Sequence, residues 1–245
     1  MSIEVFNRYE YKYLINREQF DKISSVITEY MVSDEYNKNG HIYTISNIYY
    51  DTFDDYLIRT SLSKPMYKEK LRLRAYGIPN DDSEVFMEIK KKFNGIVNKR
   101  RTSINLNDAY RYLNFKQIPE DTKYTNQQVF KEINNFTSRY ALVPKVYIAY
   151  DRIAYFDKDN SDLRISFDFN IRTRRDNLFL ESGDYGNLLL SDDMCVMEIK
   201  TSYAIPLWLV NLLCEFEIKR TGFSKYGKEY IKMLSKRRNK VGQLI

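Results

Sequence analysis

The sequence predicts an α+β fold of about eight mainly antiparallel strands with helices packed on the outside. Residues 70–74 (KLRLR) and 163–172 (LRISFDFNIR) alternate strictly between apolar and polar side chains. A period of two is typical of a β-strand, whose successive side chains point to opposite faces. Other stretches repeat their apolar residues every three to four positions, as helices do. Since no linker or internal repeat interrupts these 245 residues, we expect a single domain over 1–245.

The first half of the chain contains most of the predicted strands. In order, we expect a strand over 3–14, a helix over 17–31, a strand over 42–51, a short helix over 54–62, and strands over 67–76, 83–92 and 97–105. Asn16 and Gln19 fit a capping box at the start of the first helix. Asn94 and Gly95 are a turn signal that makes the last two strands an antiparallel pair.

The second half alternates between helices and strands. We expect a helical section over 107–139, strands over 145–156 and 162–172, an irregular stretch over 176–192, a strand over 194–201, and helices over 205–215 and 224–238. The most apolar stretch, 203–216, contains Pro206 and is shorter than the ~20 residues of a membrane-spanning helix. We therefore expect no membrane span.

The polar faces of the predicted strands are rich in arginine and lysine. They carry Arg8, Glu10, Lys12, Lys70, Arg72, Arg74, Glu84, Glu88, Lys90, Lys99, Arg101, Arg152, Arg164, Asp168, Arg172, Glu198 and Lys200. One interpretation is a solvated face with cross-strand ion pairs of ~0.2–1 kcal/mol each. The arginines two residues apart, and opposite faces apolar enough to pack against helices, favour a sheet that closes into a cationic tunnel.

An enclosed face of this kind requires an anionic ligand, because desolvated like charges repel one another. Phosphate chains match it, since arginine binds phosphate oxygens in pairs and lysine adds point charges. The carboxylates suit Mg²⁺ or Mn²⁺, which prefer oxygen ligands. The sequence thus favours a polyphosphorylated ligand with a divalent metal.

Other kinds of site find little support. The chain has no GxxxxGK[ST] or GxGxxG motif, and its one histidine, His41, is expected to be structural. Cys195 and Cys214 stand in no CxxC spacing, which argues against zinc and fits a reducing, cytoplasmic setting. The N-terminus lacks the features of a signal peptide. Nucleic-acid binding is disfavoured because most aromatic residues fall on the strand faces opposite the cations.

Taken in order, several short motifs resemble the VTC-type polyphosphate polymerase domain of the triphosphate tunnel metalloenzyme (CYTH-like) superfamily. They are 8–13 (RYEYKY), 48–52 (IYYDT), 71–74 (LRLR), 88–90 (EIK), 99–101 (KRR), 150–152 (YDR), 163–168 (LRISFD), 198–200 (EIK) and 223–226 (FSKY). The resemblance covers nearly the whole chain. It implies an eight-stranded antiparallel closed tunnel that binds ATP or triphosphate, and polyphosphate, with a divalent metal.

The resemblance also implies roles for individual residues. Catalytic phosphate contacts fall on Lys12, Arg72, Arg74, Lys90, Arg152 and Lys200; further phosphate-binding residues are Lys99, Arg101, Arg164, Ser224 and Lys225. Glu198 is implied as the main metal ligand for Mn²⁺ or Mg²⁺, with help from Glu10 and Glu88, and Asp168 as an accessory carboxylate. One departure is Arg8, which stands where the superfamily's ExExK signature has its first acid and favours the VTC branch.

Three functions remain open at this point. The first is an ATP-dependent polyphosphate polymerase that passes the γ-phosphate of ATP to a growing chain. The second is a tunnel triphosphatase that uses water as the acceptor for inorganic triphosphate or a nucleoside triphosphate. The third is a non-catalytic polyphosphate-binding module, which needs the cations but not Glu198. By comparison with the eukaryotic polymerase complexes, we expect a stand-alone soluble protein.

Overall fold

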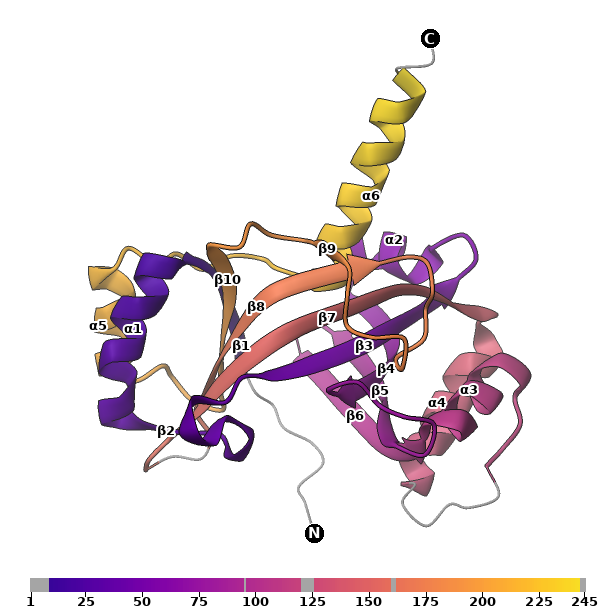
Figure 1. Cartoon of the computed structure of the whole chain (residues 1–245), viewed down its shortest axis with the longest axis horizontal. Coiled ribbons are helices and arrows are strands. Elements are labelled where there is room, and N and C mark those ends of the chain that lie inside the picture. Colours follow the sequence, from indigo (N-terminus) through magenta and orange to yellow (C-terminus); the bar gives the residue numbers. More distant parts are fainter. Residues whose placement is uncertain (1–8, 95, 120–125, 160–161, 243–245) are drawn as a thin grey trace.

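The computed structural model describes residues 9–94, 96–119, 126–159 and 162–242, which form one curled antiparallel sheet and surrounding helices (Figure 1). The strands are β1 (Tyr9–Asn16), β2 (Met31–Ser33), β3 (Tyr43–Thr52), β4 (Tyr67–Tyr76), β5 (Glu84–Phe93), β6 (Ile96–Asn105), β7 (Leu142–Asp157), β8 (Arg164–Arg174), β9 (Asn187–Leu188) and β10 (Met194–Thr201). The predicted α+β class is confirmed. Arg8 lies outside the described residues.

Six α-helices and one 3₁₀-helix complete the described part of the chain. They are α1 (Arg17–Tyr30), η1 (Glu35–Gly40), α2 (Tyr56–Leu62), α3 (Leu106–Phe115), α4 (Gln127–Arg139), α5 (Leu207–Glu215) and α6 (Lys225–Gly242). The capping box of Asn16 and Gln19 is present at the start of α1. The helical section expected over 107–139 is two helices, and β2, η1 and β9 were not predicted.

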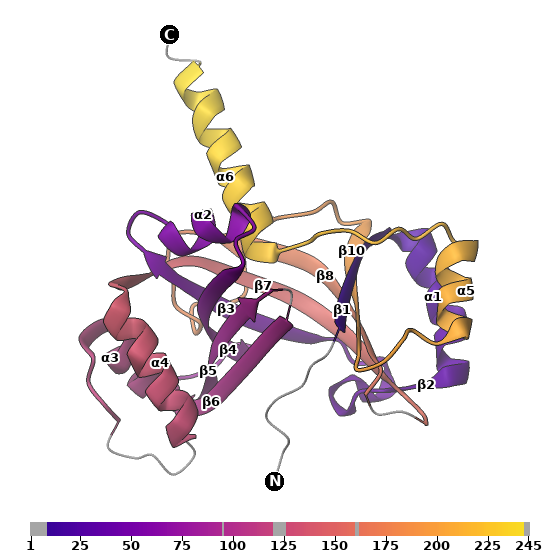
Figure 2. The same ribbon diagram turned by 180° about the vertical axis from the view of Figure 1, so that it is seen from behind.

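The predicted closure of the sheet into a barrel is wrong. Eight strands follow one another in the order β1-β10-β8-β7-β3-β4-β5-β6, so the described residues form no ladder between β1 and β6. These two edges lie apart in both views of the molecule (Figures 1 and 2). Both edges are dense in charged side chains, which oppose strand pairing. The sheet is therefore an open half-barrel with a concave inner face and a convex outer face.

Irregularities in the strands produce the curl and change one predicted orientation. The register shifts between Tyr49 and Tyr50 on β3 and between Ala149 and Asp151 on β7. Such bulges bend a strand and increase its twist. Opposite the second shift, Asn170 adopts a φ of 45°, a left-handed conformation that asparagine tolerates.

Arg172 consequently does not share the inner face with Arg164 and Asp168, as the strict alternation predicted. It lies on the outer face, where its guanidinium pairs with Asp151 at 3.0 Å and with Asp184 at 2.5 Å. The extra residue at the bulge reverses the parity of β8 beyond Asn170. Its charge is thus not available to a ligand on the inner face.

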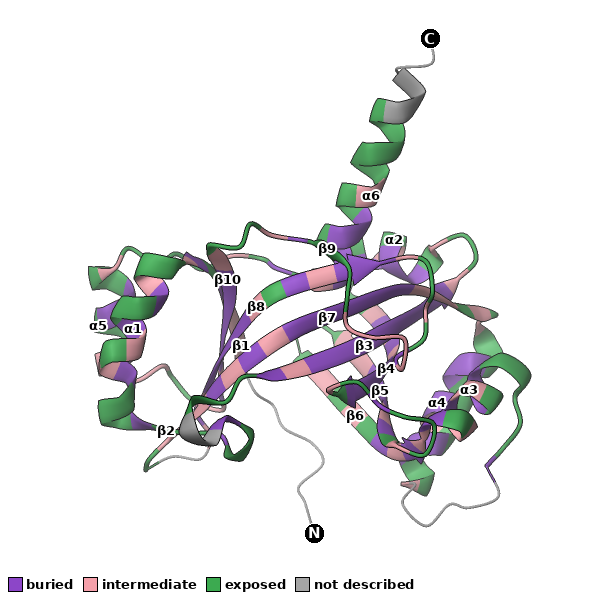
Figure 3. Ribbon diagram, viewed as in Figure 1, coloured by how far each residue is buried: buried purple, intermediate pink, exposed green. Residues whose placement is uncertain are grey.

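Helices pack on the outer face of the sheet through apolar side chains. Apolar side chains also fill one end of the inner face. On the outside, Tyr112 and Phe136 of α3 and α4 belong to one buried cluster, and Ile23 of α1 belongs to another. A third cluster includes Val196 and Ile171 on the inner face together with aromatic residues of α6. The far half of α6 extends away from the sheet and is exposed (Figure 3). The charged part of the inner face therefore begins where α6 meets the sheet.

Asp51 joins three elements at this junction. Its buried carboxylate accepts hydrogen bonds from the amides of Leu57 and Ile58 at 2.8 and 2.9 Å, and from the hydroxyl of Tyr226 at 3.0 Å. The first two bonds satisfy free N–H groups at the start of α2. The third fixes the first turn of α6 against the sheet.

We expect Asp51→Ala to lower the free energy of unfolding by about 2–4 kcal/mol, because several buried donors lose a charged acceptor. Tyr226→Phe removes a single hydroxyl and should cost about 1 kcal/mol. Urea denaturation of both variants measures the difference. Equal losses in the two variants would contradict the role of Asp51 as a junction of α2 and α6.

Candidate functional site

The inner face gathers charged side chains from seven strands and from the start of α6. Arg72 and Arg74 come from β4, Lys99 from β6 and Glu88 from β5, because residues of equal parity point the same way. Arg74 and Glu88 are buried, with side chains 6% and 1% exposed. These side chains therefore face into the curl of the sheet and not into bulk solvent.

Glu88 is the centre of the first cluster, which joins three neighbouring strands. Its carboxylate lies 2.5 Å from Arg72, 3.0 Å from Lys99 and 3.6 Å from Arg74. Arg72 also donates to the hydroxyl of Tyr49 at 3.0 Å. Three cations thus share one carboxylate, which leaves an excess of positive charge on β4 and β6.

Neutral side chains hold Arg74 in the same cluster. Its guanidinium donates to Oδ1 of Asn47 at 2.9 Å and to the hydroxyl of Tyr150 at 3.1 Å. Burial favours the neutral form of Tyr150, but the charges of Arg74 and Arg152 outweigh it and lower the pKa of its hydroxyl. The orientation of Arg74 is therefore fixed before any ligand binds.

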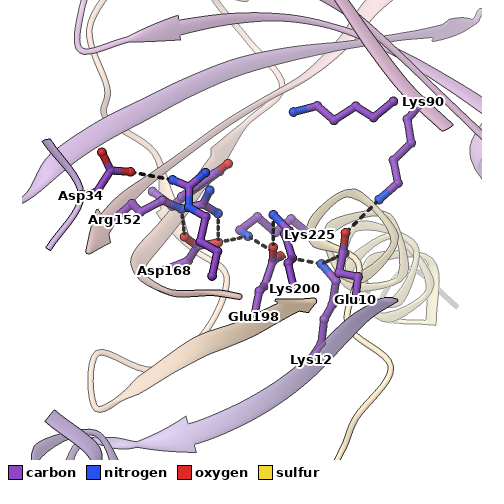
Figure 4. Close-up of polar contacts among 12 residues, drawn as sticks. Glu10, Lys12, Asp34, Lys90, Arg152, Asp168, Glu198, Lys200 and Lys225 are labelled. Atoms are coloured by element: carbon purple, nitrogen blue, oxygen red, sulfur yellow. Dashed lines mark hydrogen bonds and ion pairs between the residues drawn. The ribbon is translucent and has the colours of Figure 1, made fainter. Parts of the chain in front are cut away.

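Glu198 is the centre of the second cluster (Figure 4). Its carboxylate lies 2.6 Å from Lys12 of β1, 3.3 Å from Lys200 of the same strand and 3.8 Å from Lys225 of α6. Burial tends to raise the pKa of Glu198, but the ammonium charges of these lysines hold it well below the usual range. Glu198 is therefore ionised at neutral pH.

Asp168 connects this cluster to β7. Arg152 donates to both of its carboxylate oxygens, at 2.6 and 2.8 Å, and Lys225 forms an ion pair with it. The ammonium of Lys225 also lies 4.2 Å from the centre of the Tyr150 ring, within range of a cation–π interaction. A residue of α6 is thus part of the inner face.

The remaining predicted site residues lie toward the edges of the inner face. Lys90 of β5 reaches Glu10 of β1 at 3.6 Å, so an ion pair joins the two halves of the open sheet. Arg164 binds Asp34 at 2.8 Å. Ser224 lies beside Lys70, with 3.4 Å between its hydroxyl and the ammonium. Arg101 donates to the hydroxyl of Tyr76 at 3.4 Å.

Cations outnumber carboxylates in this set by eleven to five. The cations are Lys12, Lys70, Arg72, Arg74, Lys90, Lys99, Arg101, Arg152, Arg164, Lys200 and Lys225; the carboxylates are Glu10, Asp34, Glu88, Asp168 and Glu198. The residues are held in fixed positions by ion pairs that neutralise fewer than half of the positive charges. The arrangement can therefore bind a ligand with several negative charges.

Burial makes two lysines of this face harder to protonate, and neighbouring cations add to the effect. Burial lowers the pKa of Lys70 to about 8, and the nearby ammonium groups of Lys90 and Lys68 act in the same direction. Burial also lowers the pKa of Lys200; Glu198 and Glu10 oppose this shift, while Arg152 and Arg164 add to it. An anion bound beside these lysines would raise their pKa again.

Comparisons with known proteins agree with this geometry. The family model of the VTC domain matches residues 7–234. The chain belongs to the VTC domain family. No curated protein matches the sequence. None of the helices in the described part of this VTC domain has the length and apolar composition needed to span a bilayer.

Solved structures share the fold at low sequence identity. A candidate adenylate cyclase from Bacillus halodurans is 13% identical, with a TM-score of 0.52, over 89% of this chain and 96% of the other. A candidate adenylyl cyclase from Hippeastrum, whose dominant activity is described as that of a triphosphatase, is also 13% identical, with a TM-score of 0.46, over 89% of this chain and 92% of the other. At 13% identity, the similarity to the Bacillus halodurans structure shows only that the two chains share a fold.

The three carboxylates predicted as metal ligands are not gathered at one point in the VTC domain. Glu10 and Glu198 meet at Lys12, whose ammonium lies 3.0 Å from the first and 2.6 Å from the second. Glu88 pairs with a separate set of cations. No group of three or more histidine, cysteine, aspartate or glutamate side chains suited to a metal occurs within the described residues. Mg²⁺ is commonly held by one or two carboxylates together with substrate phosphates, and Glu10 with Glu198 fits that donor set.

Several functional neighbours of the cations were not predicted from the sequence. Asn47, Tyr49 and Tyr150 orient Arg72 and Arg74, and Asp34 binds Arg164. The parity of β3 was available as a signal, since Asn47 and Tyr49 alternate with the apolar Ile48. Asp34 had no such signal, because it precedes η1 and lies outside the long strands.

Lys70 predicts a pH dependence of the ligand-free VTC domain. With a pKa of about 8 in the folded state and about 10.4 when unfolded, the unfolded chain binds more protons between these values. The free energy of unfolding should therefore rise with pH from about 7 to 9, by up to about 1 kcal/mol from this residue.

Urea denaturation at both pH values, in buffers free of polyvalent anions, measures the rise. Lys70→Met cannot be protonated, so its rise should be smaller than that of the wild type. An identical rise in the two proteins would show that Lys70 does not titrate in this range. Lys22→Met is a matched control, because Lys22 lies on the exposed side of α1.

Proposed function

We propose that this VTC domain is an ATP-dependent polyphosphate polymerase that transfers the γ-phosphate of ATP to a growing phosphate chain. One observation supports the proposal: eleven cations but only five carboxylates lie along one concave face. A phosphate chain carries a negative charge at each unit and matches such a row of cations. In the transfer, the bond from the γ-phosphorus to the ADP oxygen breaks, and a new one forms to the terminal oxygen of the chain.

The residues of the two clusters would share this work. Arg72, Arg74 and Arg152 are oriented by Glu88, Asn47, Tyr150 and Asp168, and their remaining N–H groups would bind phosphate oxygens. Lys12, Lys200 and Lys225 add point charges around Glu198. Phosphoryl transfer depends mainly on positioning and on stabilising charge in the transition state, and fixed cations supply both.

Glu198 and Glu10 would hold Mn²⁺ or Mg²⁺ together with the substrate. When bound, such an ion would supply positive charge against the charge that develops on the transferred phosphoryl group. Before the substrate binds, Lys12 would keep the two carboxylates together, since its ammonium lies within 3.0 Å of both. Glu88 would instead orient Arg72 and Lys99 for phosphate binding.

The triphosphatase alternative differs only in the acceptor, which is water in place of a phosphate chain. The open edge between β1 and β6 favours the polymerase, because an open half-barrel admits a chain longer than three phosphates. The binding-module alternative requires the cations alone. Glu198 next to Glu10, a pair of carboxylates suited to a divalent ion, favours a metal-dependent reaction over simple binding.

The product of the reaction tests the proposal. Purified protein is incubated with ATP and Mn²⁺, and ADP, free phosphate and polyphosphate are resolved. We expect ADP and polyphosphate in matching phosphate equivalents. Free phosphate with no polymer would favour the triphosphatase, and no turnover with any divalent metal would favour the binding module.

In the same assay, Glu198→Gln should lose metal-dependent turnover. The substitution keeps the shape of the side chain but removes the charge that a divalent ion needs. The variant should still bind tripolyphosphate, because Lys12, Lys200 and Lys225 remain. Unchanged turnover with an unchanged Mn²⁺ dependence would make Glu198 a structural residue.

Two arginines on opposite faces of the sheet provide a matched test of phosphate binding. Arg72→Gln removes a cation from the inner face, and Arg172→Gln removes one from the outer face. A hydrogen bond to a charged group contributes ~1.5–3 kcal/mol, so the first variant should bind tripolyphosphate about 10- to 100-fold more weakly. The second should bind it like the wild type. Calorimetry measures both, and equal affinities of the two variants would refute the assignment of the inner face.

A further inference from the structure

Helix α5 carries apolar residues on both of its sides. On the side that faces the sheet, Leu209 and Leu213 belong to the same buried cluster as Ile23 of α1. On the outward side, Leu207 is 74% exposed, and Val210 is exposed as well. A helix that is apolar all round is normally buried all round. The outward side of α5 has no covering partner among the described residues.

The exposed residues of α5 form one stripe. Leu207, Val210 and Cys214 are three and then four positions apart, which is the spacing of the seam between two paired helices. Asn211 is exposed beside them, and Tyr203 extends the surface ahead of the helix. In both views α5 lies beside α1 at one extremity of the molecule (Figures 1 and 2). A second helix can therefore approach it along its length.

This surface is uncharged in a highly charged chain. Residues 201–214 include no aspartate, glutamate, lysine or arginine, although these types make up 29% of the sequence. The chain has a net charge of +6, so two copies repel each other least where their surfaces carry no charge. Glu215 and Glu217 follow at the edge of the surface and oppose docking onto an anionic bilayer. These charges favour a second copy of the chain over a lipid surface.

The two ends of α5 complement each other. No side chain of the described residues caps its start at Pro206, and its first turn contains no acid. Its last turn contains no basic residue and ends with Glu215. Negative charge stabilises the N-terminus of a helix and positive charge the C-terminus, so neither end is stabilised within one copy. An antiparallel second copy brings Glu215 of each helix beside the start of the other.

We propose that two copies of the VTC domain associate through α5, packed antiparallel about a two-fold axis. The axis passes between Val210 and Asn211, so each copy contributes the same stripe to the interface. Leu207 of each copy then lies opposite Cys214 of the other. Because α5 covers the outer face of the sheet, this association is independent of the proposed function of the inner face.

Sedimentation of the wild type and two variants tests the association. The wild type should sediment with twice the 29.4 kDa mass of one chain. Leu207→Glu should raise the dissociation constant at least about 100-fold, because two-fold symmetry counts each lost contact twice. A glutamate in the first turn suits the helix dipole, so circular dichroism should show an intact fold. Ile118→Glu is the matched control, since Ile118 is 63% exposed beyond α3, and should sediment like the wild type.

Cross-linking tests the register of the two helices. Leu207→Cys places a thiol opposite Cys214 of the other copy. Diamide, which takes up the two thiol hydrogens, should then join the chains by a disulfide. The wild type should not be joined, and neither should Leu207→Cys combined with Cys214→Ser, because identical positions lie about 10 Å apart along the antiparallel helices. Cys195 is buried and should not react.

The outcomes decide what covers α5. A wild type that remains a single chain at every concentration overturns the proposal, and so does a dimer that Leu207→Glu leaves intact. A disulfide through Cys214 alone overturns the antiparallel register. A single chain that binds vesicles of phosphatidylcholine and phosphatidylserine, and loses them in Leu207→Glu, also overturns the proposal and assigns the surface to a membrane.

Discussion

Repulsion among like charges on the concave face is the constraint on which the rest of the structure depends. Each buried carboxylate relieves it by pairing with cations from different elements. Glu88 joins β4 and β6, Glu198 joins β1 and α6, and Asp168 joins β7 and α6. Buried ion pairs add little net stability when compared with apolar packing, but the loss of one partner is costly. The acids therefore position the cations more than they stabilise the fold.

A further ion pair bridges the open side of the half-barrel. No ladder joins β1 to β6 among the described residues, yet Lys90 reaches Glu10 across the opening at 3.6 Å. At the other end, Asp51 and the apolar cluster of Val196 and Ile171 hold α6 against the sheet. The inner face thus changes along its length from apolar at α6, through the two charged clusters, to the aromatic rings of Tyr43 and Tyr76.

Much of this arrangement could be predicted from the alternation of residues along the strands. The parity of Arg72 and Arg74, or of Glu198 and Lys200, needs only the period of a β-strand. The alternation predicts the wrong face where the backbone departs from that period. The bulge at Asn170 therefore places Arg172 on the outer face. Closure of the sheet depends on pairing between β1 and β6, which are distant in sequence and leave no local signal. The stacking of Tyr36 on Tyr76 was missed because Tyr36 comes from a short 3₁₀-helix that the pattern did not reveal.

The position of Lys12 links the proposed metal site to the proposed phosphate site. Its ammonium is within 3.0 Å of both Glu10 and Glu198, and together with Lys200 and Lys225 it keeps Glu198 ionised. In the proposed reaction, a divalent ion would take the place of Lys12 beside these two carboxylates and would leave its ammonium free to turn toward a phosphate. Binding of a divalent ion and binding of phosphate would then strengthen each other, and by thermodynamic linkage the two effects are equal. Under the proposed function, a carboxylate pair held by a lysine would make the cationic face responsive to a phosphate that arrives with its metal.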